Sequence, residues 1–148
     1  MVLIAGIVSC SKTETKSPEQ FAQVLVKSLK EKDKDLFESL FITESEYDEV
    51  ASPTPADSWI KADKKIMLQL TGKQISEFDQ LVSNLGPITG GGLEDCQPQE
   101  FFDTESASST RIFITAPDGT KKILYMDLMY KCGENWRTVG EFRMRDEY

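Results

Sequence analysis

The sequence predicts an α+β domain in which N-terminal helices pack on a curved antiparallel meander of four strands. In the first half of the chain, apolar residues recur at helical spacing between recognisable start and stop signals. From Thr110 to Arg145, apolar and polar residues instead alternate around two tight turns. Helices followed by strands, rather than the two in alternation, indicate an α+β architecture.

The expected helices have clear N-terminal signals. Ser17 stands before Pro18 and Gln20, which is the pattern of a capping box with proline at the first helical position. Thr43 and Glu46 repeat the capping pattern. Apolar residues at helical spacing follow the first signal in two runs: Phe21, Val24, Leu25 and Leu29, then Leu36, Phe37, Leu40 and Phe41.

A further helical pattern runs from Asp57 to Leu85. It weakens at Thr71-Gly72 and ends at Gly86-Pro87, a glycine cap followed by proline. The glycines of Thr89–Gly92 predict a flexible loop, because no lysine and no preceding strand support a phosphate-binding function. A weaker strand is expected through Gln99, Phe101 and Phe102.

The first of the two tight turns is Pro117-Asp118-Gly119. Proline pre-sets the first turn residue and glycine accepts positive φ, so we expect a bulged turn that places Ala116 opposite Thr120 and Ile112 opposite Leu124. A two-residue turn would instead place Ile112 opposite Tyr125 and Phe113 opposite Leu124, which mixes the two faces of the sheet.

The second turn is predicted as the three-residue loop Gly133-Glu134-Asn135, with Asn135 in the left-handed conformation. This register pairs Cys132 with Trp136, Tyr130 with Thr138, Leu128 with Gly140 and Met126 with Phe142. Gly140 would bend the last strand. Both turns then select the same core face: Leu124, Met126, Leu128, Tyr130 and Cys132.

Composition excludes several classes of function. The chain has 148 residues, a formal net charge of -8 and no histidine. The negative charge argues against nucleic acid and against attraction to anionic lipid. Without histidine there is no imidazole base, no Cys/His nucleophile pair and no His-ligated zinc. No metal site and no cofactor are expected.

The apolar run Met1–Ser9 ends in Ile7-Val8-Ser9-Cys10, which resembles the lipobox of bacterial lipoproteins. The resemblance implies cleavage before Cys10, acylation of that residue and lipid anchoring in the bacterial cell envelope, on the periplasmic or surface side. No basic region precedes the short run, so we expect it to belong to a longer leader. The predicted organisation is a signal segment over 1–9, a tether over 10–17 and one domain over 18–148. The alternative is an N-terminal core strand with Cys10 buried.

The order of elements and the segment Gly133-Glu134-Asn135-Trp136-Arg137 resemble the nuclear-transport-factor-2-like or cystatin-like superfamily. That resemblance implies a cone-like fold, and its members include ketosteroid-isomerase-type enzymes and ligand carriers. A fold of this kind does not by itself assign a function. A pocket in the cone would be lined by Tyr130, Trp136, Thr138, Phe142 and Met144, although packing in the core is the preferred interpretation of these residues.

The outer face of the sheet is expected to bind a protein partner or a second copy, because it carries more apolar residues than an idle surface needs. These residues are Phe113, Ile123, Tyr125, Met129 and Val139. Asp127 and Glu141 would lie opposite each other there, neutralised by neighbouring arginines. Cys96 and Cys132 are expected to be unpaired, because the meander separates them by roughly 30 Å.

Two functions remain open. The first is a lipid-anchored envelope domain that holds a small apolar ligand or a protein partner. The second is an isomerase or dehydratase with a carboxylate inside the cone. The predicted core face carries no carboxylate, and Asp103 or Glu105 would have to supply one, so the binding domain is preferred.

Overall fold

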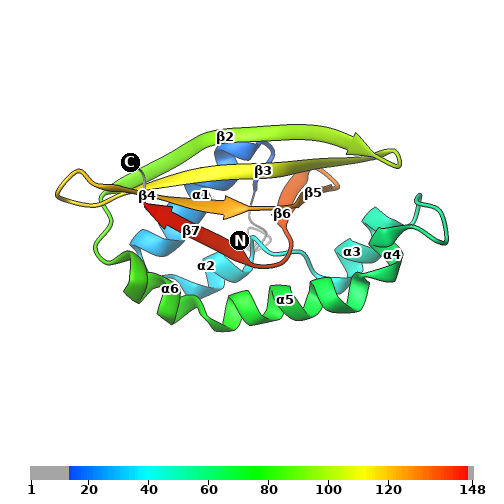
Figure 1. Ribbon diagram of the computed structural model, residues 1–148, viewed down its shortest axis with the longest axis horizontal. Coiled ribbons are helices and arrows are strands. Elements are labelled where there is room, and N and C mark those ends of the chain that lie inside the picture. The colour runs from blue at the N-terminus through cyan, green and yellow to red at the C-terminus, as the bar shows by residue number, and fades with distance from the viewer. Residues whose placement is uncertain (1–13, 147–148) are drawn as a thin grey trace, which may run out of the picture.

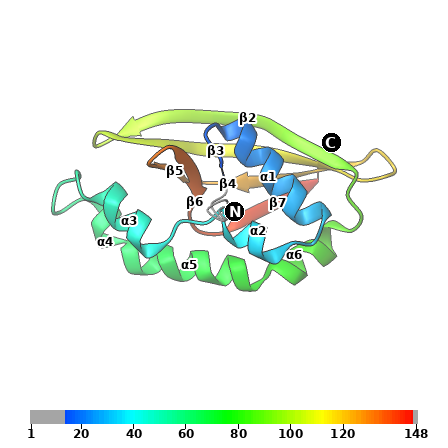
Figure 2. The same cartoon turned by 180° about the vertical axis from the view of Figure 1, so that it is seen from behind.

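The computed structural model describes residues 14–146 and confirms the α+β architecture, with the helices before the strands (Figures 1 and 2). The helices are α1 (Pro18–Lys30), α2 (Lys34–Glu38), α3 (Glu44–Ala51), α4 (Trp59–Ala62), α5 (Lys64–Ser76) and α6 (Phe78–Leu85). The strands are β2 (Gly90–Phe101), β3 (Thr104–Thr115), β4 (Lys121–Met126), β5 (Met129–Cys132), β6 (Asn135–Thr138) and β7 (Phe142–Asp146).

Within residues 14–146 the strands form one antiparallel sheet of six strands, where four were expected. Its order is β6-β5-β3-β4-β7, and β2 pairs with the other edge of β3. The two expected long strands are each interrupted, at Asp127-Leu128 between β4 and β5 and at 139–141 between β6 and β7. As a result β3 pairs first with β4 and then with β5.

The predicted helix caps are present. The Ser17 hydroxyl accepts a hydrogen bond from the Gln20 N–H at 3.1 Å. Thr43 and Glu46 form a complete capping box at the start of α3. Gly86 ends α6 with a φ of 70°. The weak point that was expected at Thr71-Gly72 lies instead at Glu77, where α5 ends.

The predicted turn at Pro117-Asp118-Gly119 is confirmed. The Gly119 N–H donates to the Ala116 carbonyl at 2.9 Å, and the Ala116 N–H donates to the Thr120 carbonyl at 2.9 Å. Gly119 has a φ of 87°, and Ile112 lies opposite Leu124. Local residue chemistry therefore determines this register.

The predicted second turn is wrong by one residue. Gly133 takes the left-handed conformation, with a φ of 66°, and the loop holds two residues rather than three. Cys132 therefore lies opposite Asn135, and Lys131 opposite Trp136. A shift of one residue turns side chains to the other face of a sheet. The interruption at 139–141 is one residue longer than that at 127–128, which restores the predicted pairing of Met126 with Phe142.

The predicted loop at Thr89–Gly92 is also wrong, because Gly90 begins β2. Gly91 lies opposite Ile114, where α1 crosses the sheet. A Cβ on Gly91 would collide with the Phe113 carbonyl oxygen and lie 3.0 Å from Val26 Cγ2. Glycine is needed there for close approach, rather than for flexibility.

Two apolar clusters fill the molecule. The main cluster lies between the sheet and α1, α2 and α6, and includes Phe21, Leu25, Leu29, Phe37, Phe78, Leu81, Ile112, Leu124, Met126, Met129 and Trp136. The second lies between β5 and α3–α5, and includes Ile42, Tyr47, Val50, Ile60, Tyr130, Cys132 and Val139. The β5–β6 end of the sheet is therefore buried on both faces.

Helix α5 is joined to the interrupted part of the sheet by polar side chains. Thr71 Oγ1 accepts from the Gly140 N–H at 2.8 Å, and Gln74 Oε1 accepts from the Phe142 N–H at 2.8 Å. These two are the buried residues of α5. They accept hydrogen bonds from two backbone N–H groups, one within and one directly after the 139–141 interruption of the strand ladder.

We expect Gly91→Ala to destabilise the protein by at least about 2 kcal/mol, because the added methyl group meets backbone that cannot move aside cheaply. The matched control is Gly90→Ala, where a Cβ would meet nothing within 4 Å. Urea unfolding at pH 7 compares the two. Equal stability of the two variants would contradict the close packing of α1 on β2.

Candidate binding surface

The chain is fixed to the sheet from Thr15 onward. Thr15 is fully buried. Its hydroxyl donates to the Trp136 carbonyl at 2.7 Å, and its backbone carbonyl accepts from the Trp136 N–H at 2.8 Å. Its N–H donates to Asn135 Oδ1 at 2.7 Å, and Arg137 donates to its hydroxyl at 2.8 Å. The expected tether over 10–17 therefore includes a residue that adds to the edge of β6. Cys10 lies outside the described residues.

The five residues predicted to line a pocket do not share one space. Tyr130 belongs to the second cluster and Trp136 to the main one, because the shorter turn moves β6 by one residue relative to β5. Thr138 lies opposite Met129 and is fully buried, whereas Met144 is exposed. Phe142 packs against the rings of Phe37 and Phe41. The predicted cone site is occupied by core packing.

Two of these residues have buried hydroxyls for which residues 14–146 provide no hydrogen-bond partner. Tyr130 Oη and Thr138 Oγ1 are buried and make no hydrogen bond among the described residues. Tyr47, whose ring meets that of Tyr130 edge to face, differs in donating its hydroxyl to the Ile60 carbonyl at 2.7 Å. Burial raises the pKa of Tyr130 well above its usual value, so its hydroxyl stays neutral.

The predicted partner face is smaller than expected. Met129 and Val139 were assigned to it wrongly: both are buried, Met129 in the main cluster and Val139 in the second. Phe113, Ile123 and Tyr125 do share the outer face, but Ile123 is buried by its neighbours.

Cations cover the two rings on this outer face. Lys121 Nζ lies 5.0 Å from the ring centre of Phe113, and the Arg145 guanidinium carbon lies 5.2 Å from that of Tyr125. Long basic side chains of this kind cover apolar surface with their stems. The outer face is therefore capped by the chain's own residues.

The predicted opposition of Asp127 and Glu141 is wrong, because both residues lie in the interruptions between strands. Asp127 pairs with Arg143, and Glu141 pairs with Lys73 of α5 at 3.0 Å. Both are exposed ion pairs that contribute little stability.

Cys96 and Cys132 are free thiols with different surroundings. Cys96 Sγ lies 3.6 Å from Thr110 Oγ1, and Cys132 Sγ contacts the Tyr130 carbonyl at 3.7 Å. Burial raises the pKa of the Cys132 thiol to about 12, with nearby Glu46 adding to the effect. A thiol of this kind does not act as a nucleophile near neutral pH.

The most distinctive surface feature is one that the sequence analysis did not single out. Trp59, Phe101 and Phe102 form an exposed aromatic cluster, here called the aromatic tip. Their side chains are 38%, 41% and 39% exposed. The Trp59 and Phe101 rings are 6.2 Å apart and the Phe101 and Phe102 rings 5.4 Å apart, both nearly edge to face. The tip joins α4 to the β2–β3 hairpin at one end of the molecule (Figure 1).

The turn at the aromatic tip is strained. Phe101 pairs with Thr104, so Phe102 and Asp103 form a two-residue loop, with φ values of 52° and 61°. Positive φ at both positions is typical of a type I′ turn, which favours Asn-Gly. Left-handed phenylalanine costs roughly 1–2 kcal/mol. A longer loop over 103–109 was expected between these two strands of the meander; the tight turn was not predicted, because Phe102-Asp103 is not an Asn-Gly or Asp-Gly pair.

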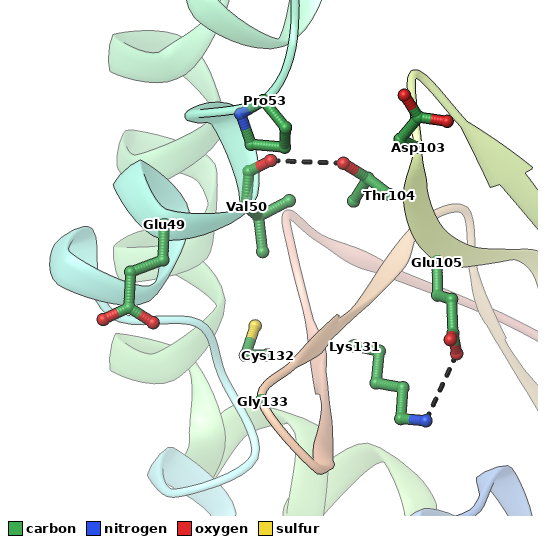
Figure 3. A pocket seen from close by; sticks show the side chains of 9 residues that line it. All are labelled: Glu49, Val50, Pro53, Asp103, Thr104, Glu105, Lys131, Cys132 and Gly133. Carbon is green, nitrogen blue, oxygen red and sulfur yellow. Dashed lines mark hydrogen bonds and ion pairs between the residues drawn. The ribbon is translucent and has the colours of Figure 1, made fainter.

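A cleft of about 370 Å³ lies beside the turn. Val50 and Pro53 form one wall, Thr104 and Lys131 the other, and Cys132 is at the base (Figure 3). Thr104 donates to the Val50 carbonyl at 3.2 Å and so joins the hairpin to α3. The remaining lining residues are Glu49, Asp103, Glu105 and Gly133.

The surroundings of the tip and cleft are acidic. Glu105 points toward Lys131 and pairs with it at 3.3 Å (Figure 3). Within residues 14–146, Glu49 and Asp103 form no ion pair. Within three positions of the aromatic residues, or lining the cleft, there are five carboxylates (Glu49, Asp57, Glu100, Asp103 and Glu105) and two lysines (Lys61 and Lys131). A positively charged group is attracted here.

No protein-family model, curated protein or solved structure matches this chain. Among residues 14–146, no helix is both long and apolar enough to cross a bilayer. The same residues hold no group of three or more Cys, Asp or Glu side chains placed to bind a metal ion.

We expect Tyr130→Phe to leave stability unchanged or to raise it by up to about 1 kcal/mol, because the lost hydroxyl has no hydrogen-bond partner in the part of the chain that the structure describes. Tyr47→Phe removes a bonded hydroxyl and should cost about 1 kcal/mol. Urea unfolding at pH 7 measures both. A clear loss of stability in Tyr130→Phe would instead mean that its hydroxyl holds a bound group.

Stability should fall at alkaline pH because of Cys132. The pKa of the Cys132 thiol is 9.0 in the unfolded chain and about 12 in the folded protein. The contribution of this thiol to the free energy of unfolding is therefore complete below pH 9. It is lost between pH 9 and 12, because the unfolded chain releases the proton first. The parent should lose up to about 1.4 kcal/mol more per pH unit in this range than Cys132→Ala. Unfolding curves of the parent and of Cys132→Ala between pH 9 and 11 test the difference in slope. An unchanged slope in Cys132→Ala contradicts this assignment.

Proposed function

We propose that this protein is a lipid-anchored interaction domain of the bacterial cell envelope, which holds a protein partner at the aromatic tip. The observation that carries the proposal is an exposed aromatic cluster built on a strained turn, in a molecule whose predicted internal pocket is filled. Exposed aromatic side chains of this kind are typical of binding hot spots.

The anchor is supported by the lipobox-like Ile7-Val8-Ser9-Cys10 and by the position of Thr15. Four residues separate Cys10 from Thr15, so the chain between them spans at most about 18 Å. An acyl group on Cys10 would keep the β6 edge close to the bilayer. Two or three acyl chains anchor a protein stably, whereas a single chain binds only marginally.

We further propose that the fold is a cone-like variant of the nuclear-transport-factor-2-like or cystatin-like type. Joining β4 to β5 and β6 to β7 across their interruptions gives a four-stranded meander behind N-terminal helices, which supports this assignment. The cone would be closed by packing, since β5 and β6 are buried on both faces.

The alternatives have less support. An isomerase or dehydratase needs a carboxylate inside the cone, and the buried polar side chains of residues 14–145 are hydroxyl, amide and guanidinium groups. Asp103 and Glu105 are exposed at the hairpin. A small apolar ligand would have to displace the aromatic packing around Phe37 and Phe142.

We expect Cys10→Ser, expressed with its full native leader, to move from the membrane fraction to the soluble fraction with its fold unchanged. Detergent-phase partitioning and circular dichroism measure the two outcomes. Cys96→Ser, which removes a thiol elsewhere, is the control and should stay membrane-bound. High salt should not release the parent, because an acidic domain gains no attraction from anionic headgroups. Membrane-bound Cys10→Ser, or release of the parent by salt, would disprove the anchor.

A further inference from the structure

We propose that the aromatic tip docks into a basic protein surface, in which an apolar pocket is bordered by lysine or arginine side chains. This inference rests on the proposed function, since it names the chemistry of the partner. It does not depend on the lipid anchor.

Phe102 is exposed at the surface, although its ring contacts that of Phe101. Its backbone is left-handed, a conformation that asparagine or glycine adopts more easily, and its side chain is 39% exposed. Strained residues that persist at a surface point to a binding role. Phe102 lies in the loop between β2 (Gly90–Phe101) and β3 (Thr104–Thr115). Figure 2 shows that this end of the hairpin lies toward one end of the molecule.

The aromatic tip is supported by contacts with α3 and α4. Phe101 contacts the Trp59 ring of α4, and Thr104 is bonded to Val50 of α3. The hairpin end is therefore braced against two helices. A preorganised aromatic group loses little conformational freedom on binding, which favours its use as an anchor residue.

The residues next to Phe101 and Phe102 in the chain are negatively charged. Asp103 shares the turn with Phe102, and Glu100 precedes Phe101 directly. These carboxylates form no ion pair among the described residues, so they are free to meet cations on a partner. Charge complementarity of this kind selects partners and speeds association. It disfavours a second copy of a chain whose net charge is -8.

Strand pairing is a poor alternative mode of docking here. The free edge of β2 carries Pro98 and register shifts on both sides of Asp95. Proline and bulges are devices that block edge-to-edge pairing. The partner is therefore expected to engage side chains at the tip rather than the backbone of β2.

The experiment uses the full chain carrying Cys10→Ser and a fluorescein-labelled nonapeptide of alternating arginine and leucine. Fluorescence anisotropy should show micromolar binding, and Phe102→Asn should weaken it at least about fivefold. Because asparagine tolerates the left-handed backbone of this turn, the melting temperature of Phe102→Asn should stay within about 3 °C of that of the parent. Asp103→Asn should also weaken binding and should reduce its salt dependence.

Matched controls separate a site from general attraction between an acidic protein and a basic peptide. Ile66→Asn removes the most exposed large apolar side chain of the described residues, 57% exposed on α5, and should leave the affinity unchanged. The same peptide with glutamate in place of arginine should not bind.

The inference is overturned if Phe102→Asn binds the peptide as tightly as the parent, or if Ile66→Asn loses as much affinity. It is also overturned if no binding occurs up to about 1 mM, or if phosphatidylcholine vesicles compete at the tip as well as the peptide does. These outcomes are independent of the Cys10 fractionation. Loss of the anchor alone leaves tip-dependent binding intact, whereas failure at the tip removes the partner class and not the anchor.

Discussion

The architecture depends on two interruptions of the sheet that differ in length by one residue. Two residues, Asp127 and Leu128, leave the ladder on one strand, and three, 139–141, leave it on its neighbour. The hairpin β5–β6 is therefore one residue out of phase with the pair β4–β7. Because side chains alternate along a strand, that single residue decides which of them face α1 and which face α3–α5.

The same interruptions attach helix α5 to the sheet. Gly140, with a φ of 87°, turns the chain and leaves its N–H free for Thr71, and the next free donor, Phe142, goes to Gln74. Helix α5 is held to the sheet at these points although its apolar residues are largely exposed or half-buried. Helix α4 directly precedes α5 in the chain and begins at Trp59. The position of α5 therefore also sets the position of Trp59. The aromatic tip is thus a consequence of the interrupted sheet.

Features encoded by neighbouring residues could be predicted, and those that depend on distant contacts could not. Ser17 and Thr43 cap helices, and Pro117-Asp118-Gly119 sets a register, because each acts within one turn of chain. Gly133-Glu134-Asn135 permits either a two-residue or a three-residue loop, since both glycine and asparagine accept positive φ. Only the packing of β6 against Thr15 and the 40–42 segment distinguishes them.

The candidate site residues show the same difference between features set by neighbouring residues and features set by distant contacts. The pocket and outer-face residues were assigned by alternation, so the phase change at 127–128 placed Met129 and Val139 on the wrong side. Gly91 was taken for a loop residue because its need for glycine comes from α1, which is distant in sequence. Phe101 and Phe102 were placed in a strand, but Phe102-Asp103 lacks the residues that indicate a turn.

Whether the aromatic tip serves the fold or a partner can be weighed by magnitude. The edge-to-face contact of Phe102 with Phe101 contributes about 0.5–1.5 kcal/mol. The left-handed backbone of Phe102 costs roughly 1–2 kcal/mol, so the two effects nearly cancel. The ring contact with Phe101 alone therefore gives no reason for phenylalanine at a position that asparagine or glycine would fill more easily. A large apolar side chain that stays exposed on a strained backbone is better explained by what it contacts outside the molecule.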